Sequence, residues 1–191
     1  MTNLAILYQS TYGHTEKVAN YVKEGASVEG VKVTLYKVED VIKNLDLLDS
    51  ADAIIFGTPT YMGSASAVMK QFMEASSKKW FNLEWAGKIA AGFTNSGQLS
   101  GDKLFTLMEL SIFAAQHNMV WVNAGLPNSS KEEGHGGKPA DINRVGCYLG
   151  LMTQSDGADV EKTPSPGDLE SAKMFGAHVA NAAKRWVKGG K

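Results

Sequence analysis

Short apolar runs alternate with amphipathic segments along the chain. The runs Leu4–Tyr8, Ala53–Phe56 and Ile89–Phe93 are bounded by polar or turn-forming residues, a pattern typical of strands buried on both faces of a parallel sheet. Val31–Tyr36 alternates apolar and polar residues, which indicates a more exposed strand. Met119–Val122 is a fifth apolar run, so the pattern predicts five strands.

The segments between these runs carry apolar residues at helical spacing, which predicts helices between the strands and a last helix near the end. The apolar stripes are Thr15, Val18, Ala19, Val22 and Ala26; Ala65, Val68, Met69, Phe72 and Met73; Leu104, Leu107, Met108, Ser111 and Ala115; and Ala172, Phe175, Gly176, Val179 and Ala183. The last helix has a clear start. Ser165 can act as its N-cap, Pro166 suits the first turn, and Asp168 stands where a capping-box acid would.

Strands joined by helices predict an α/β fold, in which one open, five-stranded parallel sheet carries helices on both faces. We expect a single domain over residues 1–191. The stretch at about 125–147 has no clear period and is rich in glycine and charge, which predicts a long irregular loop. Leu149–Met152 indicates a brief return to the sheet. Because ligands of open parallel sheets bind outside the carboxyl ends of the strands, the loops after the first, third and fourth strands are the expected site.

Composition narrows the class of protein. The 191 residues hold 19 Lys plus Arg and 20 Asp plus Glu, a net charge of −1, which argues against a nucleic-acid binder with its usual basic excess. The longest apolar run has five residues, too few to span a membrane, and no signal-peptide pattern is visible. Cys147 is the one cysteine, so we expect neither an internal disulfide nor a cysteine-rich metal site. These features favour a cytoplasmic protein without metal, nucleic-acid or membrane partners.

The first candidate loop, Gln9–Thr15, lies between the first strand and the first helix. Ser10, Thr11 and Thr15 offer hydroxyl groups, and Gly13 allows a tight turn. Backbone amides and the helix dipole favour an anion such as phosphate here; the alternative is a capped helix start whose polar residues face water. The loop has neither a Walker lysine nor a G-x-G-x-x-G motif, which disfavours a P-loop NTPase and a Rossmann dinucleotide site. A phosphate held without lysine or arginine indicates a monophosphate cofactor.

The second and third candidate loops, Gly57–Ser66 and Thr94–Asp102, are rich in small and hydroxyl residues. Neither contains a Ser/His/Asp set, a carboxylate pair or a metal cluster. Both can supply backbone amides, and the second can supply an aromatic face. Such surroundings suit a flat heteroaromatic ring that carries its own chemistry, so we expect no catalytic side chain.

At these three loops the sequence resembles the FMN-binding loops of flavodoxin-fold proteins, and it is most similar to the WrbA-like NAD(P)H:quinone oxidoreductases. The resemblance covers most of the chain and implies a flavodoxin-like sheet with strand order 2-1-3-4-5 and FMN as the cofactor. It is carried by Ser10-Thr11-Tyr12-Gly13-His14-Thr15, Phe56-Gly57-Thr58-Pro59-Thr60-Tyr61-Met62-Gly63, Thr94-Asn95-Ser96-Gly97 and the closing helix at Asp168-Leu169-Glu170.

The resemblance implies a role for each loop. The FMN phosphate would be held by Ser10, Thr11, Tyr12, Gly13, His14 and Thr15. The isoalloxazine ring would be lined by Pro59, Thr60, Tyr61, Met62 and Gly63. Its pyrimidine edge and the ribityl chain would be bound by Thr94, Asn95, Ser96, Gly97 and Gln98.

Three single residues also match family positions. His117 matches a histidine near the flavin, the alternative being a histidine at a helix C-terminus that the helix dipole favours. Tyr12 would lie near the nicotinamide nucleotide. Trp80 matches a tryptophan that reaches the flavin of a neighbouring subunit, with simple packing as the alternative.

The leading hypothesis is an FMN-dependent oxidoreductase that takes a hydride from NAD(P)H and passes two electrons to a quinone-like acceptor. The resemblance also implies a homo-oligomer, either a dimer or a tetramer. The alternative is a flavodoxin-type electron carrier without its own NAD(P)H reaction. Such carriers are strongly acidic because they steer onto basic partners, so a net charge of −1 weakens this alternative. A partner-binding module without activity is a third hypothesis. The sequence leaves open the physiological acceptor and the choice between NADH and NADPH.

Overall fold

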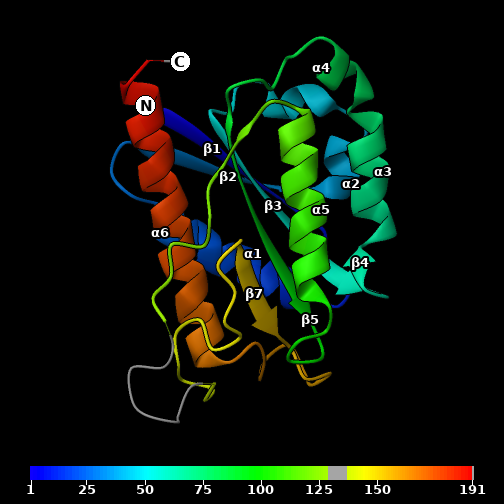
Figure 1. Ribbon diagram of the computed structural model, residues 1–191, viewed down its shortest axis with the longest axis vertical. Coiled ribbons are helices and arrows are strands. Elements are labelled where there is room, and N and C mark those ends of the chain that lie inside the picture. The colour runs from blue at the N-terminus through cyan, green and yellow to red at the C-terminus, as the bar shows by residue number, and fades with distance from the viewer. Residues whose placement is uncertain (129–136, 191) are drawn as a thin grey trace.

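The computed structural model describes residues 1–128 and 137–190, which form a sheet between two layers of helices (Figure 1). The strands are β1 (Thr2–Tyr8), β2 (Val31–Lys37), β3 (Ala53–Tyr61), β4 (Ser64–Ala65), β5 (Ile89–Ser96), β6 (Val120–Trp121) and β7 (Leu151–Gln154). The helices are α1 (His14–Ala26), α2 (Val38–Val41), α3 (Ala67–Ala75), α4 (Ser77–Phe81), α5 (Lys103–Gln116) and α6 (Pro166–Lys188), with a 3-10 turn η1 (Leu45–Leu48).

The order of the strands across the sheet is β2-β1-β3-β5-β6, with β7 also paired to β5. These pairings are all parallel, and only the short β4 runs antiparallel to its partner β3. Counted along the chain, the five predicted strands therefore take the order 2-1-3-4-5. The predicted α/β fold and its strand order are confirmed.

The fifth position of the sheet differs from the single strand predicted at Met119–Val122. It holds two short strands: β6 pairs with the start of β5 at Ile89 and Ala90, and β7 pairs with the end of β5 from Phe93 onward. The chain leaves the sheet after β6 and returns to it as β7. The irregular loop expected at about 125–147 lies within this excursion, and its residues 129–136 lie outside the described residues.

The third and fourth strands run further than the sequence predicts. β3 continues through Pro59 to Tyr61, and β5 continues to Ser96, so parts of both expected loops are strand. Beyond Tyr61, Met62 and Gly63 have φ angles of 49° and 81° and join β3 to β4. Positive φ at both central residues is the geometry of a tight two-residue hairpin. The second candidate loop is therefore a rigid hairpin.

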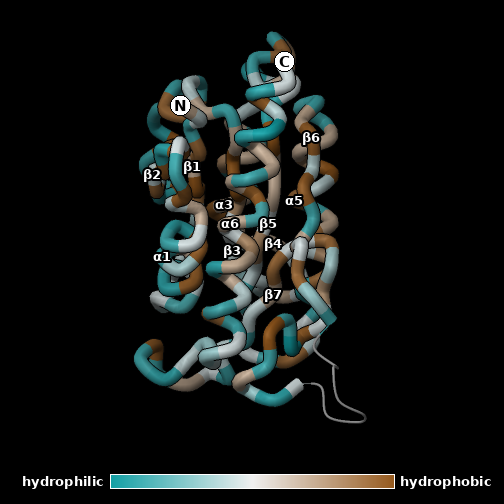
Figure 2. Tube along the Cα trace, turned by 90° about the vertical axis from the view of Figure 1, so that its left-hand side faces the viewer, coloured by the Kyte–Doolittle hydropathy of each residue, from teal (hydrophilic) through white to brown (hydrophobic). Residues whose placement is uncertain are grey.

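Two cores lie on the two faces of the sheet. One face packs against α1 and α6, and the other packs against α2, α3 and α5. Leu4 and Ile6 point into the first core, whereas Ala5 and Leu7 point into the second, because successive side chains of a strand point to opposite faces. Figure 1 shows this layered arrangement edge-on, with α6 on the left of the sheet and α3 and α5 on the right, whereas Figure 2 looks onto the face of the sheet that α6 covers.

Both termini lie at the end of the sheet where β1 begins, at the top of Figures 1 and 2. The candidate loops therefore lie at the opposite end, where the parallel strands finish. Within the described residues, no helix is both long and apolar enough to cross a membrane.

Candidate functional site

A pocket of about 610 Å³ opens at the carboxyl ends of β1, β3 and β5. Its volume falls within the range of roughly 300–1,000 Å³ that is typical of small-molecule sites. All three candidate loops meet there because β1, β3 and β5 are neighbours in the sheet. The predicted site residues that line it are Ser10, Tyr12, His14, Thr15, Pro59, Thr60, Tyr61, Asn95, Ser96 and Gly97.

The first loop offers hydrogen-bond donors for an anion. Gly13 is the N-cap of α1, has a φ of 90°, and supplies no side-chain cap, so the first amides of the helix are available to a ligand. The hydroxyl of Ser10 accepts from the Gly13 amide at 3.1 Å, and that of Thr11 accepts from Gln9 Nε2 at 3.1 Å. Since both oxygens already accept, each hydroxyl can donate its hydrogen to a phosphate. Thr15, 2% exposed, adds a third hydroxyl beside the pocket.

The hairpin of the second loop forms an aromatic rim. The ring of Tyr61 stands edge-on to that of Tyr12, with 6.4 Å between the ring centroids, and both side chains are exposed. Glu109 of α5 fastens the hairpin by accepting from Ser64 Oγ at 2.8 Å and from the Ala65 amide at 2.9 Å.

The hairpin turn itself does not meet the expectation. Met62 and Gly63, expected at the ring, are absent from the residues that line the pocket. Met62 is fully exposed at the tip of the turn. The reason is geometric, because β3 carries the chain past the pocket before it turns.

The third loop divides between the pocket and the interior. Thr94 is fully buried, and its hydroxyl lies 2.8 Å from that of Thr60. Asn95 is held in place because Thr153 Oγ1 donates to its Oδ1 at 2.8 Å while its Nδ2 donates to Ser155 Oγ at 3.1 Å. Thr94 therefore supports the site from below rather than lining it.

A fourth wall, which the sequence did not predict, follows β7. We call residues 155–163 the strap; Ser155, Gly157, Ala158, Asp159 and Val160 line the pocket. Two residues of α1 fasten it. His14 donates through Nε2 to the Ala158 carbonyl at 2.9 Å, and Lys17 Nζ donates to the Val160 carbonyl at 2.6 Å. A carbonyl can only accept, so His14 carries its proton on Nε2.

The signal for the strap lies in the brief return to the sheet. A strand at Leu151–Gln154 that runs parallel to β5 must end at the same edge as β5. The residues that follow such a strand then border the site. The hydrophobic pattern does not reveal the strap, because Met119–Val122 already accounts for a complete fifth strand.

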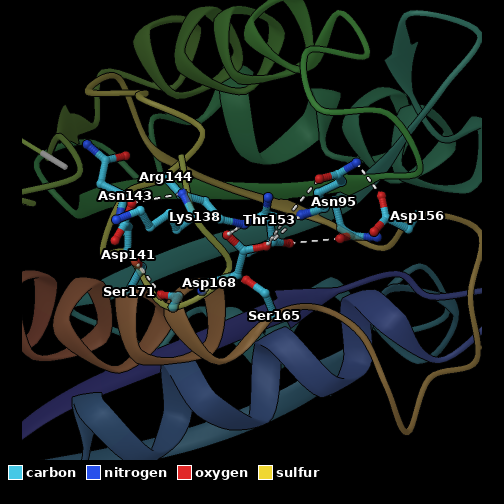
Figure 3. A network of polar contacts seen from close by, with 12 residues as sticks. Asn95, Lys138, Asp141, Asn143, Arg144, Thr153, Asp156, Ser165, Asp168 and Ser171 are labelled. Atoms are coloured by element: carbon cyan, nitrogen blue, oxygen red, sulfur yellow. Dashed lines mark hydrogen bonds and ion pairs between the residues drawn. The ribbon is translucent and has the colours of Figure 1, made fainter. Parts of the chain in front are cut away.

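A buried ion pair connects the irregular loop to this end of the sheet. Figure 3 shows Arg144 of that loop facing Asp168 of α6, and the guanidinium binds both carboxylate oxygens at 3.0 Å. The two side chains are 8% and 2% exposed. Arg144 also donates to Gln154 Oε1 at 2.9 Å, and Gln154 Nε2 donates to the Gly97 carbonyl at 3.2 Å. The pair therefore fixes the end of β7 against the third loop.

The expected capping box at the start of α6 is corrected by this ion pair. Ser165 is the N-cap as predicted, since its Oγ accepts from the Asp168 amide at 3.3 Å. The carboxylate of Asp168, however, binds Arg144 and accepts from the Gln154 amide at 3.0 Å. A buried guanidinium competes successfully for the carboxylate because a paired charge is far less costly to bury than a lone one.

Lys103, the first residue of α5, is a second unpredicted polar residue at this edge. Its side chain is fully buried, and Nζ donates to Ser96 Oγ at 2.8 Å and to the Gln98 carbonyl at 2.6 Å. Burial lowers the pKa of Lys103 to about 8, an effect that nearby Asp168 opposes and Arg144 reinforces. Gln98, expected in the site, thus offers its carbonyl to Lys103 and does not line the pocket.

His117 lies at the other end of the molecule. It follows the last residue of α5, whose 14 residues extend about 20 Å, so it is remote from the third loop at the start of that helix. Its Nε2 is 2.9 Å from Ser76 Oγ, and its ring packs on Trp85 with centroids 4.7 Å apart. Burial lowers the pKa of His117 to about 4. The structure therefore does not bring His117 to the pocket. His117 is the C-cap of α5, as in the alternative, but burial and not the helix dipole sets its pKa.

Trp80 lies near His117 and not near the pocket. Both line a second groove of about 540 Å³ between α3, α4 and α5. Trp80 is 45% exposed, so its ring is not fully accounted for by packing within the chain. Among the described residues, no group of three or more His, Cys, Asp and Glu side chains is placed to hold a metal ion.

Comparisons with known proteins bear on the pocket. Residues 2–134 match the family described as NADPH-dependent FMN reductase. Flavodoxin FldP from Pseudomonas aeruginosa is 39% identical over 191 residues, which covers 97% of this chain and 98% of that relative. The solved structure of a flavodoxin, WrbA-like protein from Agrobacterium tumefaciens is 40% identical with a TM-score of 0.75, covering 97% of this chain and 99% of that one. A flavodoxin from the domain Archaea, 20% identical, covers 96% of this chain and 99% of that one with a TM-score of 0.65 and shares the fold.

Proposed function

We propose that the chain is an FMN-dependent oxidoreductase. It belongs to the NADPH-dependent FMN reductase family, and its flavodoxin fold is close to that of WrbA-like proteins. In this proposal it takes a hydride from NAD(P)H and passes two electrons to a quinone-like acceptor. The observation that carries the proposal is the pocket at the carboxyl ends of β1, β3 and β5, with an uncapped helix start on one side.

The donors around the pocket fit FMN. A single phosphate suits the amides of α1 and the hydroxyls of Ser10, Thr11 and Thr15, because these neutral donors stabilise an anion at a helix N-terminus. Lys17 does not contribute its charge there, since its ammonium is bound to carbonyls of the strap. The site therefore supports a monophosphate held without a cation.

The other walls suit an isoalloxazine ring. Pro59, Thr60 and Tyr61 form one side, and Asn95 with Ser96 offers polar groups to the edge of the ring. Bound FMN would accept the hydride and pass on the electrons. The chain would orient the FMN ring and exclude water from one of its faces. Tyr12, exposed at the rim, is placed to contact the nicotinamide nucleotide.

One observation favours the electron carrier as a second candidate, since the relative from Pseudomonas aeruginosa that is 39% identical is named a flavodoxin. Such a carrier would bind FMN in the same pocket. It would receive electrons from a partner protein and not from NAD(P)H.

Anaerobic titration of the FMN-loaded protein separates the two candidates. For the oxidoreductase, we expect either NADH or NADPH to bleach the flavin absorbance directly and added quinone to restore it. Dithionite serves as the control that the bound flavin can be reduced. Reduction by dithionite with no bleaching by either nucleotide would reject the oxidoreductase in favour of the carrier. Parallel titrations with FMN and FAD test the monophosphate site, which should prefer FMN.

We further propose that the chain forms a homo-oligomer through the outer face of α5. Leu104, Phe105, Met108 and Ile112 are between 43% and 58% exposed, while Leu107 and Leu110 on the other side are buried. Hydrophobic residues recur along α5 at the right-hand edge of Figure 2. A helix that is apolar all round is usually buried on all sides, and a patch of this kind often marks an interface.

Light scattering tests the oligomer. We expect the wild type to exceed the 20.5 kDa of one chain and the Phe105→Glu, Ile112→Lys variant to approach it. Trp80 belongs to the neighbouring groove, so a dimer or tetramer formed here could bring it to a neighbouring subunit. A monomeric wild type would contradict the proposal.

A further inference from the structure

The ammonium group of Lys103 is buried beneath the third loop, which forms one wall of the pocket, and among the described residues it has no carboxylate partner of its own. Lys103 is fully buried, and within residues 1–128 and 137–190 no ion pair joins its Nζ to a carboxylate. Lys79, by contrast, is bound by Asp46, Asp49 and Glu84, each at 2.6 Å. Burial of a charge is costly unless the charge is paired, so Lys103 needs a further explanation.

The contacts of Lys103 lead to the pocket. Its Nζ donates to Ser96 Oγ at 2.8 Å, and Ser96 lines the pocket. A serine oxygen that accepts from an ammonium is polarised, and its hydroxyl becomes a stronger donor. The Ser96 hydroxyl lies 3.3 Å from the Gln98 carbonyl, which Lys103 already serves at 2.6 Å. If the Ser96 hydroxyl rotates toward a ligand, the Gln98 carbonyl therefore keeps Lys103 as its donor.

The position of Ser96 in the sheet separates it from the phosphate loop. Ser96 ends β5, the loop follows β1, and β3 lies between these strands. Two strand spacings amount to about 10 Å. Lys103 therefore acts on the part of a ligand that lies over β5 and not on a phosphate held at the start of α1.

We propose that Lys103, acting through Ser96, is a positioning residue that makes the pocket bind reduced FMN more tightly than oxidised FMN. The proposal rests on the proposed function. Transfer of a hydride converts NAD(P)H to NAD(P)⁺ and adds two electrons and one proton to FMN, so the bound group gains one negative charge. A buried ammonium beside a polarised hydroxyl stabilises that added charge and raises the reduction potential. The lowered pKa of Lys103 agrees with a charge that lacks a carboxylate partner.

The test compares the affinity for oxidised FMN and the two-electron potential of the loaded protein in four variants. Lys103→Met keeps the length of the side chain without its charge, Ser96→Ala removes the hydroxyl, and the double variant combines them. Lys79→Met removes a buried lysine that is remote from the pocket and serves as the control. We expect Lys103→Met to reduce the preference for the reduced form at least tenfold, which makes the two-electron potential at least about 30 mV more negative.

The remaining variants separate the pathway from a structural effect. Ser96→Ala should shift the potential in the same direction, the double variant should shift it no further than Lys103→Met, and Lys79→Met should leave it unchanged. A loaded Lys103→Met protein with the wild-type potential would overturn the proposal and leave Lys103 as an anchor of the third loop. Equal weakening of both oxidation states, with riboflavin spared, would also overturn it by assigning Lys103 to the phosphate.

Two further outcomes remain interpretable. If Lys103→Met does not fold, Ser96→Ala decides, because its side chain lies at the pocket surface; an unchanged potential in that variant overturns the proposal. If the wild type binds no FMN, the proposed function fails first, and the proposal for Lys103 falls with it. The two failures are distinguished by the wild-type titration alone.

Discussion

Thr15 illustrates how a single residue can serve both the helix and the pocket. It begins the apolar stripe of α1, is 2% exposed, and still lines the pocket. His117 shows the reverse case, because a polar residue that sequence similarity assigned to the flavin lies instead among aromatic rings at the far end of α5. At the scale of residues, burial alone therefore does not separate a site residue from a core residue.

We predict that Thr15→Val weakens FMN binding more than riboflavin binding. Only the phosphate loses a donor in this variant. A hydrogen bond to a charged group contributes about 1.5–3 kcal/mol, so FMN affinity should fall roughly tenfold to a hundredfold. Fluorescence titration with both ligands measures the effect. Thr34→Val on β2, away from the pocket, is the matched control, and an equal loss for both ligands would show that the first loop does not hold the phosphate.

We predict that His117 makes stability fall as the pH is lowered from about 6.5 toward 4. The hydroxyl of Ser76 donates to the Met73 carbonyl at 2.7 Å, so it accepts from His117 Nε2, and the buried Nδ1 has no partner among the described residues. The folded pKa of about 4 lies below the ordinary 6.5. The unfolded chain therefore binds a proton in this interval that the folded chain does not, which costs about 1.4 kcal/mol per pH unit.

Urea denaturation of the wild type and of His117→Gln across this interval measures the contribution. The glutamine can still donate to Ser76 but does not titrate, so the variant should lose most of the slope. Part of the slope should remain because burial also lowers the pKa of His178. Identical slopes in the two proteins would show that His117 has the same pKa in the folded and the unfolded chain.

The elements around the pocket are held by side chains that come from outside the three loops. Glu109 of α5 fastens the β3–β4 hairpin, and Lys17 of α1 fastens the strap. On the face of the sheet opposite to α5, the helices α1 and α6 touch at two glycines. A Cβ on Gly25 would lie 1.9 Å from the Lys173 carbonyl oxygen, and one on Gly176 would lie 2.1 Å from that of Val22. The helix that begins at the pocket is therefore placed by close backbone packing.

We predict that Gly176→Ala destabilises the protein despite the better helix propensity of alanine. The added methyl group meets backbone that has to move, which typically costs about 1–3 kcal/mol, against a gain of at most about 1 kcal/mol from propensity. Gly189→Ala, at the end of the same helix, meets its nearest atom at an ordinary 3.4 Å and should be neutral or stabilising. Urea denaturation of the two variants checks this, and equal stabilities would contradict the close packing of α1 and α6.

In the whole molecule, the buried ion pair between Arg144 and Asp168 connects the long excursion between β6 and β7 to the site. Arg144 comes from the excursion, Asp168 from α6 and Gln154 from β7, and the last of these reaches the third loop at Gly97. The excursion thereby supports the edge of the sheet that carries the pocket. The role of this loop was open from the sequence, and the described part of it acts through Arg144.

We predict that Arg144→Met destabilises the protein by about 3–5 kcal/mol, because it leaves the buried carboxylate of Asp168 without its partner. The double variant Arg144→Met, Asp168→Asn should recover part of this loss, since no charge remains buried. Lys43→Met breaks the exposed pair with Asp40 and should cost at most about 1 kcal/mol. Thermal and urea denaturation measure all three. A loss for Arg144→Met no larger than that for Lys43→Met would show that the pair contributes little.

Hydrophobic patterning along the chain is enough to predict the elements and the edge of the sheet where a site could lie. Apolar runs and helical stripes are local patterns, and they placed β1, β2, α1 and α5 to within about two residues. The positions of the three loops followed from the same patterns, because parallel strands end at one edge. The same local patterns gave the wrong ends for two strands. They ended β3 and β5 too early because Thr-rich and Pro-containing segments do not resemble strands until a neighbouring strand pairs with them.

Which loop side chains reach the pocket, and which residues support them, depends on contacts between distant parts of the chain. His14 of α1 forms a hydrogen bond with Ala158 of the strap, and Arg144 of the excursion forms one with Asp168 of α6. No local pattern marks Lys103 as buried, since a lysine at a helix start usually faces water. These contacts depend on where distant segments of the chain come together. The hydrophobic pattern fixes the elements because it acts over a few residues, whereas the partners of single polar side chains are set only when the sheet brings its edges together.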